Sequence, residues 1–154
     1  MKNNDILRRL RFTFDFGDDK MMKLFEKGGE TVTRAQISDW LKKEEDEAHK
    51  PLNDRLFATF LNGLIEDKRG AKEGAKPEPE KQLNNNIILR KLKIALNFKE
   101  EDMLEVFELA EFRIGKSELS AFFRNPNQSQ YRECKDQFLR NFLIGLQLKY
   151  KPKD

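Results

Sequence analysis

The chain has 154 residues, of which 38% are hydrophobic and 37% are charged, and its formal net charge is +3. This composition is typical of a globular protein with a highly charged surface and enough apolar residues for one or two small cores. No apolar run reaches the roughly 18 residues of a membrane-spanning helix, and residues 1–15 carry Asn, Asp and Arg where a signal peptide is apolar. We therefore expect a soluble, cytoplasmic protein with no membrane partner.

The sequence contains one unit written twice. Residues 3–69 align without a gap on residues 85–151 at a constant offset of 82, with 16 identical positions. Such a repeat separates the residues that the fold uses twice from those that it does not. We predict a first helical repeat over residues 1–69, a linker over residues 70–84 and a second helical repeat over residues 85–154.

The first two helices of each repeat are predicted from local signals. In the first helix, apolar residues recur at helical spacing in the first copy, at Ile6, Leu7, Leu10 and Phe14. Asn4 and its equivalent Asn86 are suited to cap this helix. In the second helix, Phe16 lies five residues before Met21, which is the spacing of a hydrophobic staple.

The third and fourth helices follow the same logic. Thr33 and Gln36 form a capping box at the start of the third helix. Gly63 and Gly145 occupy equivalent positions inside the fourth helix, where glycine costs about 1 kcal/mol relative to alanine. A glycine kept twice at that cost indicates that another helix crosses closely there.

No run alternates apolar and polar residues at the period of a strand. The predicted fold is therefore all-α, made of two tandem and similar four-helix units. The second and third helices of each unit are spaced as in a helix-turn-helix motif. The linker contains Gly70, Gly74, Pro77 and Pro79 among charged residues, which is typical of a flexible tether.

The residue inventory argues against an enzyme. The only histidine, His49, follows the acidic run Glu44–Glu47 and is expected to be a solvated loop residue. The only cysteine, Cys134, aligns with Leu52 and is expected to act as a small hydrophobic residue. No phosphate-binding loop, HExxH or EF-hand motif occurs. We therefore expect no catalytic residues, no metal and no cofactor.

Basic residues recur in the two repeats more often than acidic ones. Seven pairs of equivalent positions are basic in both copies and only four are acidic in both. On the predicted third helix, a stripe at positions i, i+4 and i+8 consists of Arg34, Ser38 and Lys42 in the first copy and of Lys116, Ser120 and Arg124 in the second. A stripe of basic and hydroxyl side chains can hold phosphates.

Further basic residues lie on the first helix. Arg8 and Arg9, with Arg90 and Lys91 in the second copy, point away from the apolar stripe and are predicted to be exposed. Lys93 extends this basic set. These charges could instead serve stability, because Arg8 with Asp54, and Arg90 with Asp136, could form ion pairs worth about 0 to 1 kcal/mol each.

The two halves also differ in charge. Residues 113–153 contain nine basic and three acidic side chains. The second helix of the same repeat is strongly acidic, with Glu100, Glu101, Asp102, Glu105, Glu108 and Glu111. If one half binds a polyanion, we expect it to be the C-terminal half, through a face that excludes this acidic helix.

Several segments of the second repeat are distinctive: LNNNIILRKLKIAL, EEDMLE, KSELSAFFR and YRECKDQFLRNFL. Through these segments the chain resembles the YehS-like family of small bacterial proteins, and the resemblance covers essentially its whole length. Proteins of this family contain two tandem copies of a domain of unknown function. The resemblance implies a bacterial, cytoplasmic and duplicated protein. It implies no activity, ligand or catalytic residue.

Two functions from different classes follow from the sequence. The first is binding of DNA or RNA, with these candidate contacts: Arg34, Ser38, Lys42, Arg90, Lys91, Lys93, Lys116, Ser120 and Arg124. The alternative is a protein-protein interaction adaptor or a self-associating module, in which an apolar groove between the copies, or a self-association surface, receives a partner helix. The duplicated basic residues favour the first.

Overall fold

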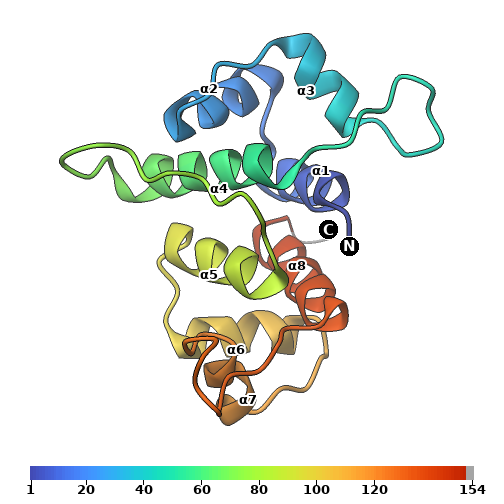
Figure 1. Ribbon diagram of the computed structural model, residues 1–154. Helices are drawn as coiled ribbons and strands as arrows, with labels where there is room; N and C mark the ends of the chain where they lie inside the picture. Colours follow the sequence, from blue (N-terminus) through green and yellow to red (C-terminus); the bar gives the residue numbers. More distant parts are fainter. Residues whose placement is uncertain (152–154) are drawn as a thin grey trace. The chain divides into compact units, whose positions relative to one another are not determined.

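The structure is a computed structural model that describes residues 1–151. This part of the chain contains eight helices and no strand, which confirms the all-α prediction (Figure 1). The helices are α1 (Asn3–Phe14), α2 (Asp18–Gly28), α3 (Arg34–Leu41), α4 (Asp54–Arg69), α5 (Asn85–Ala95), α6 (Glu100–Leu109), α7 (Lys116–Ala121) and α8 (Asp136–Tyr150). None of them is long and apolar enough to cross a membrane.

The chain divides into two compact units, Met1–Leu83 and Asn84–Asp154. Unit 1 contains α1 to α4 and unit 2 contains α5 to α8, so each unit corresponds to one repeat of the sequence. The segment between α4 and α5 belongs to unit 1 by this division. Its Lys76 ammonium donates to the carbonyl oxygen of Lys27 and to Glu66, both at 2.8 Å, although residues 71–78 are exposed.

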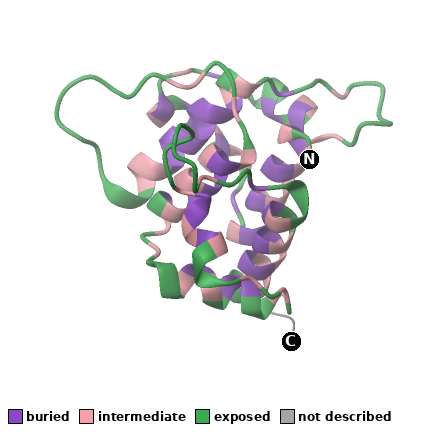
Figure 2. Cartoon of the chain, turned by 60° about the horizontal axis from the view of Figure 1, so that its bottom comes forward, coloured by how far each residue is buried: buried purple, intermediate pink, exposed green. Residues whose placement is uncertain are grey.

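Aromatic side chains form the centre of each core. In unit 1, the ring of Phe25 lies 5.3 Å from the rings of both Trp40 and Phe60. In unit 2, the equivalent Phe107 lies 5.5 Å from Phe142. Figure 2 shows the buried residues along the helices and the exposed residues in the loops.

The glycine of the fourth helix marks a close helix crossing in both units. A Cβ atom added to Gly63 would lie 1.7 Å from the carbonyl oxygen of Leu24 on α2. A Cβ atom added to Gly145 would lie 2.0 Å from the carbonyl oxygen of Val106 on α6. Leu24 and Val106 are themselves equivalent positions, so the predicted close crossing is confirmed in both units.

The start of α3 matches its prediction, whereas those of α1 and α5 do not. The capping box of Thr33 and Gln36 is present at α3. Asn4 and Asn86 do not cap their helices, because α1 begins after Lys2 and α5 is capped by Asn84, whose side chain accepts from the N–H of Ile87 at 2.9 Å. That prediction was wrong, and both asparagines have a different role.

Candidate functional site

Asn4 and Asn86 hold the loop that joins the last two helices of each unit. In unit 1, the Asn4 side-chain amide donates to the carbonyl oxygens of Trp40 and Lys50, both at 2.9 Å, and its oxygen accepts from the N–H of Leu52 at 3.0 Å. Asn4 is buried, and these bonds join the start and the end of the α3–α4 loop (residues 42–53) to α1. We call this arrangement the asparagine clamp.

Unit 2 repeats the asparagine clamp atom for atom. Asn86 donates to the carbonyl oxygens of Phe122 and Arg132 at 3.0 and 2.8 Å, and accepts from the N–H of Cys134 at 2.9 Å. The α7–α8 loop (residues 122–135) is therefore fixed to α5 in the same way. Sequence reasoning missed this role, although identity at equivalent positions in both repeats was its signal.

The backbones of the two loops also agree. In unit 1, the N–H groups of Asp46, His49 and Lys50 donate to carbonyl oxygens of residues 43, 46 and 39 at 3.0, 3.0 and 3.2 Å. In unit 2, the N–H groups of Gln128, Tyr131 and Arg132 donate to those of residues 125, 128 and 121 at 2.9, 3.1 and 3.2 Å. Each bond has its counterpart at the offset of 82, so the two loops are two copies of one scaffold.

In unit 1, carboxylates hold the basic residues of the predicted stripe. The Arg34 guanidinium donates to Asp19 and, at 3.3 Å, to Asp18. The hydrogen bond with Asp19 raises the pKa of Arg34 above its ordinary value. The Lys42 ammonium lies 3.2 Å from Asp39 and donates to the hydroxyl of Ser38 at 3.1 Å.

The predicted stripe does not lie on one helix in either unit. Helix α3 ends at Leu41, and Lys42 has extended backbone angles. Helix α7 ends at Ala121, three residues before Arg124. The asparagine clamp gives a physical reason, because its amide takes the carbonyl oxygens of Trp40 and Phe122, where each helix ends.

In unit 2, the three stripe residues have different surroundings. The hydroxyl of Ser120 donates to Glu100 on α6 at 3.1 Å. Lys116 and Arg124 are both exposed. Their side chains therefore stand in solvent at the start of α7 and in the loop that follows it.

The basic residues of the first helix are less exposed than predicted. Arg9, Arg90 and Lys91 are half-buried. Arg8 is also half-buried, because its guanidinium donates to Asp5 and to the carbonyl oxygen of Lys42 at 2.9 Å. The expectation of full exposure was wrong.

Lys93 lies on α5 beside an aromatic ring. Its ammonium is 5.4 Å from the centre of the Phe123 ring, which is within the range of a cation–π contact. Phe123 belongs to the α7–α8 loop, so Lys93 is placed next to the loop that carries Arg124.

Asparagines, not arginines, link the first and fourth helices. The side-chain amide of Asn3 donates to Asp54 at 2.8 Å, and that of Asn85 donates to Asp136 at 2.8 Å. The suggested pairing of Arg8 with Asp54 is not what the structure shows, because Arg8 is bonded to Asp5 one helical turn away.

The two units differ in how far their basic residues are neutralised. In unit 1, carboxylates pair with basic residues of the first helix region and the loop, as Arg8 with Asp5, Lys42 with Asp39, and Lys2 with Glu44. The hydrogen bond from Lys2 lowers the pKa of Glu44. At the three carboxylate positions unit 2 has uncharged residues: Ile87, Ala121 and Pro126.

His49 and Cys134 show no sign of a reactive centre. His49 Nδ1 lies 2.9 Å from the carbonyl oxygen of Lys42, so the ring is part of the loop structure. Cys134 is buried, and burial raises the pKa of its thiol to about 12. A thiol with this pKa is protonated at neutral pH and is a weak nucleophile. Among the described residues, no group of three or more His, Cys, Asp or Glu side chains could hold a metal ion.

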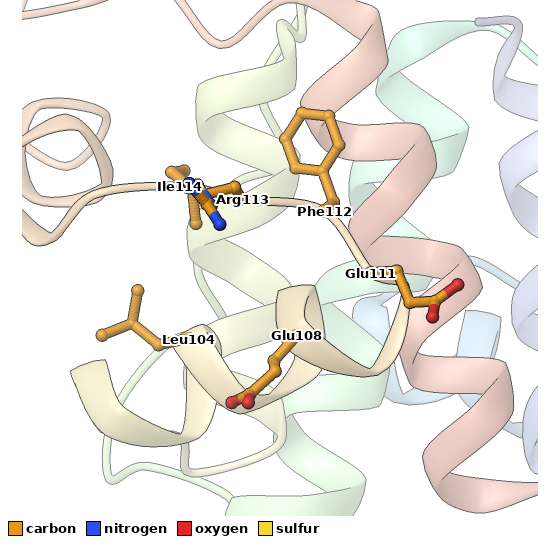
Figure 3. Close-up of a pocket in the computed structure, with 6 residues that line it drawn as sticks. All are labelled: Leu104, Glu108, Glu111, Phe112, Arg113 and Ile114. Carbon is orange, nitrogen blue, oxygen red and sulfur yellow. The ribbon is translucent and has the colours of Figure 1, made fainter.

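An open groove of about 550 Å³ lies along α6 and the segment that follows it (Figure 3). Its lining residues are Leu104, Glu108, Glu111, Phe112, Arg113 and Ile114. Glu108 on α6 and Glu111 just after its end are exposed carboxylates, so the predicted place of Glu111 on this helix was wrong. Its two carboxylates outnumber the one cation, Arg113, so the charged lining is net negative and disfavours phosphate.

Comparisons with known proteins agree with the duplicated architecture. The family DUF1456, described as "Protein of unknown function", matches residues 3–70 and again residues 85–151. The chain is 42% identical over 147 residues to "Uncharacterized protein YehS" of Escherichia coli (strain K12). The aligned region covers 95% of this chain and 94% of that protein. No solved structure matches. The chain therefore belongs to the DUF1456 family of YehS-like proteins, with one family domain in each of its two units.

Proposed function

We propose that this protein binds nucleic acid and that unit 2 carries the binding surface. The surface consists of the exposed basic side chains of α7, the α7–α8 loop and the first two turns of α8: Lys116, Arg124, Arg132, Lys135 and Arg140. Of these, Arg132 lies 3.4 Å from Glu118 on α7. The neighbouring Lys93 on α5 extends it toward Phe123. Exposed lysine and arginine side chains bind phosphates by replacing the counterions of the nucleic acid.

The main support for this proposal is that two carboxylates that pair with basic residues in unit 1 are replaced by uncharged residues in unit 2. Lys42 of unit 1 has Asp39 at 3.2 Å, whereas the equivalent Arg124 has Ala121 at that position. Arg8 has Asp5, whereas Arg90 has Ile87. Both units keep the basic residue, but only unit 1 has these carboxylates. A phosphate would have to displace Asp39 in unit 1, and it meets no such competitor at the equivalent position of unit 2.

The test is the salt dependence of binding by full-length protein. We expect affinity for mixed-sequence DNA and RNA oligonucleotides to fall steeply as the salt concentration rises, because each phosphate contact releases counterions. The substitution Arg124→Gln should reduce the slope of log affinity against log salt by about 1. The matched substitution Lys42→Gln in unit 1 should leave the slope unchanged, because Lys42 is already paired with Asp39.

Two results would contradict the proposal. One is the absence of binding to either nucleic acid at about 50 mM salt. The other is an equal reduction in the slope of log affinity against log salt in both variants. This result would mean that binding depends on the net charge of the whole chain and not on the surface of unit 2. Self-association of the purified protein without nucleic-acid binding would favour the alternative, a protein-interaction module.

A further inference from the structure

The tips of the two clamped loops, residues 43–49 and 125–131, share their backbone hydrogen bonds but differ in side-chain charge. Residues 43–49 of unit 1 read KEEDEAH, with four acidic side chains, and residues 125–131 of unit 2 read NPNQSQY, with no charged side chain. Residues 43–48 and 125–130 are all exposed. Because these side chains face solvent and the backbone bonds are shared, neither core packing nor loop shape explains the difference between the tips.

The tip of unit 2 is organised by its own side chains. The oxygen of Gln128 accepts from the N–H of Asn125 at 3.1 Å, and the side-chain oxygen of Asn125 accepts from the N–H of Asn127 at 2.9 Å. The asparagine clamp holds both ends of the loop. A segment fixed in this way loses less conformational entropy when it binds a ligand.

The groups that the tip presents suit nucleobases. Asn127 and Gln130 each carry an amide that can donate and accept hydrogen bonds, as the edges of bases require. Tyr131 is half-exposed and offers an aromatic ring on which a base can stack. Arg124 and Arg132 lie immediately before and after the tip. Arg132 lies 3.4 Å from Glu118, so Arg124 is the basic side chain next to the tip that meets no carboxylate at the position equivalent to Asp39.

We propose that residues 125–131 contact the bases of a single-stranded nucleic acid bound to unit 2, an inference that rests on the proposed function. Asn127 and Gln130 bond to base edges and Tyr131 stacks on a base. A single strand is the better ligand because its bases offer both their edges and their faces, whereas a duplex covers the faces. Helix α7 has six residues, which gives unit 2 little helix to lay along a major groove.

The test is a neutral variant of the tip in the full-length chain, carrying Asn127→Ala, Gln130→Ala and Tyr131→Ala. We expect affinity for a mixed-sequence single strand, DNA or RNA, to fall about tenfold or more, because a lost base–aromatic stack alone has an effect of that size. The salt slope should stay as in the wild type, since neutral side chains release no counterions. The matched control in unit 1, Glu45→Ala with His49→Ala, should not weaken binding.

The outcomes separate this inference from the proposed function. If the wild type binds neither single strands nor duplexes, the proposed function fails, and this inference fails with it. If the wild type binds with a steep salt dependence but the tip variant, with an unchanged melting temperature, binds as tightly, only this inference is overturned. Equal affinity of the wild type for a duplex and for its single strands would also overturn it.

Discussion

At the scale of single residues, the asparagine clamp is the most consistently repeated polar feature of the fold. Asn4 and Asn86 are buried, and each makes three hydrogen bonds to backbone atoms at the two ends of a loop. A buried polar group that loses its partner costs about 1 to 3 kcal/mol. The clamp therefore makes loop geometry and helix packing depend on each other.

Replacing Asn86 with alanine should destabilise unit 2 by at least about 2 kcal/mol, because the carbonyl oxygens of Phe122 and Arg132 and the N–H of Cys134 lose their partner. The measurement is the free energy of unfolding in urea. Asn127→Ala is the control, since Asn127 is exposed and its substitution should change stability by less than about 0.5 kcal/mol. Equal effects of the two substitutions would show that the clamp contributes nothing.

The sequence could identify these asparagines as important but not assign their role. An asparagine near the start of a helix favours a capping function on local grounds. The partners of Asn4 lie 36 to 48 residues further along the chain, and no local pattern encodes such a distance. Arg8 is the opposite case, because its partner Asp5 lies only three residues away and the duplicated Asp54 gave a misleading alternative.

At the scale of helices, the close crossing of α6 and α8 was predictable because it occurs twice. Gly145→Ala should destabilise the protein by about 2 kcal/mol or more, because the new Cβ would lie 2.0 Å from a backbone oxygen of α6 and force the helices apart. This loss outweighs the gain of about 1 kcal/mol in helix propensity. Thermal and urea unfolding would measure it.

Gly115→Ala is the control for this prediction. Nothing lies within 4 Å of the Cβ position of Gly115, and its φ is −83°, so alanine fits there without strain. We expect a change of less than about 1 kcal/mol. A Gly145→Ala variant as stable as Gly115→Ala would contradict the close crossing.

The ends of the helices were less predictable than their existence. Regular spacing from Arg34 to Lys42 predicts a longer third helix, but the asparagine clamp binds the carbonyl oxygen of Trp40 and the chain turns out of the helix at Lys42. The spacing from Lys116 to Arg124 fails in the same way. A tertiary contact accompanies the end of both helices, and in unit 2 the dipeptide Asn125-Pro126 is also a local signal for a turn just beyond.

At the scale of the whole molecule, duplication has kept the scaffold and changed the charges. The clamp, the glycine crossing and the loop backbone are shared by the two units, while Asp39 and Glu44 of unit 1 correspond to Ala121 and Pro126 of unit 2. Arg8 and Lys42 of unit 1 are paired with Asp5 and Asp39, whereas Lys116 and Arg124 of unit 2 are exposed and Arg132 lies 3.4 Å from Glu118. On the proposed function, this difference assigns the phosphate contacts to unit 2.

The most direct test of this account is an NMR titration of the isotope-labelled full-length chain with a single-stranded oligonucleotide at low salt. Unit 1 is the internal control, because each of its positions from Asn3 to Arg69 has an equivalent in unit 2. We predict amide shift changes concentrated between Lys116 and Arg140, and little change between the equivalent Arg34 and Ala58. Equal changes at both sets of positions, or none at either, would contradict it.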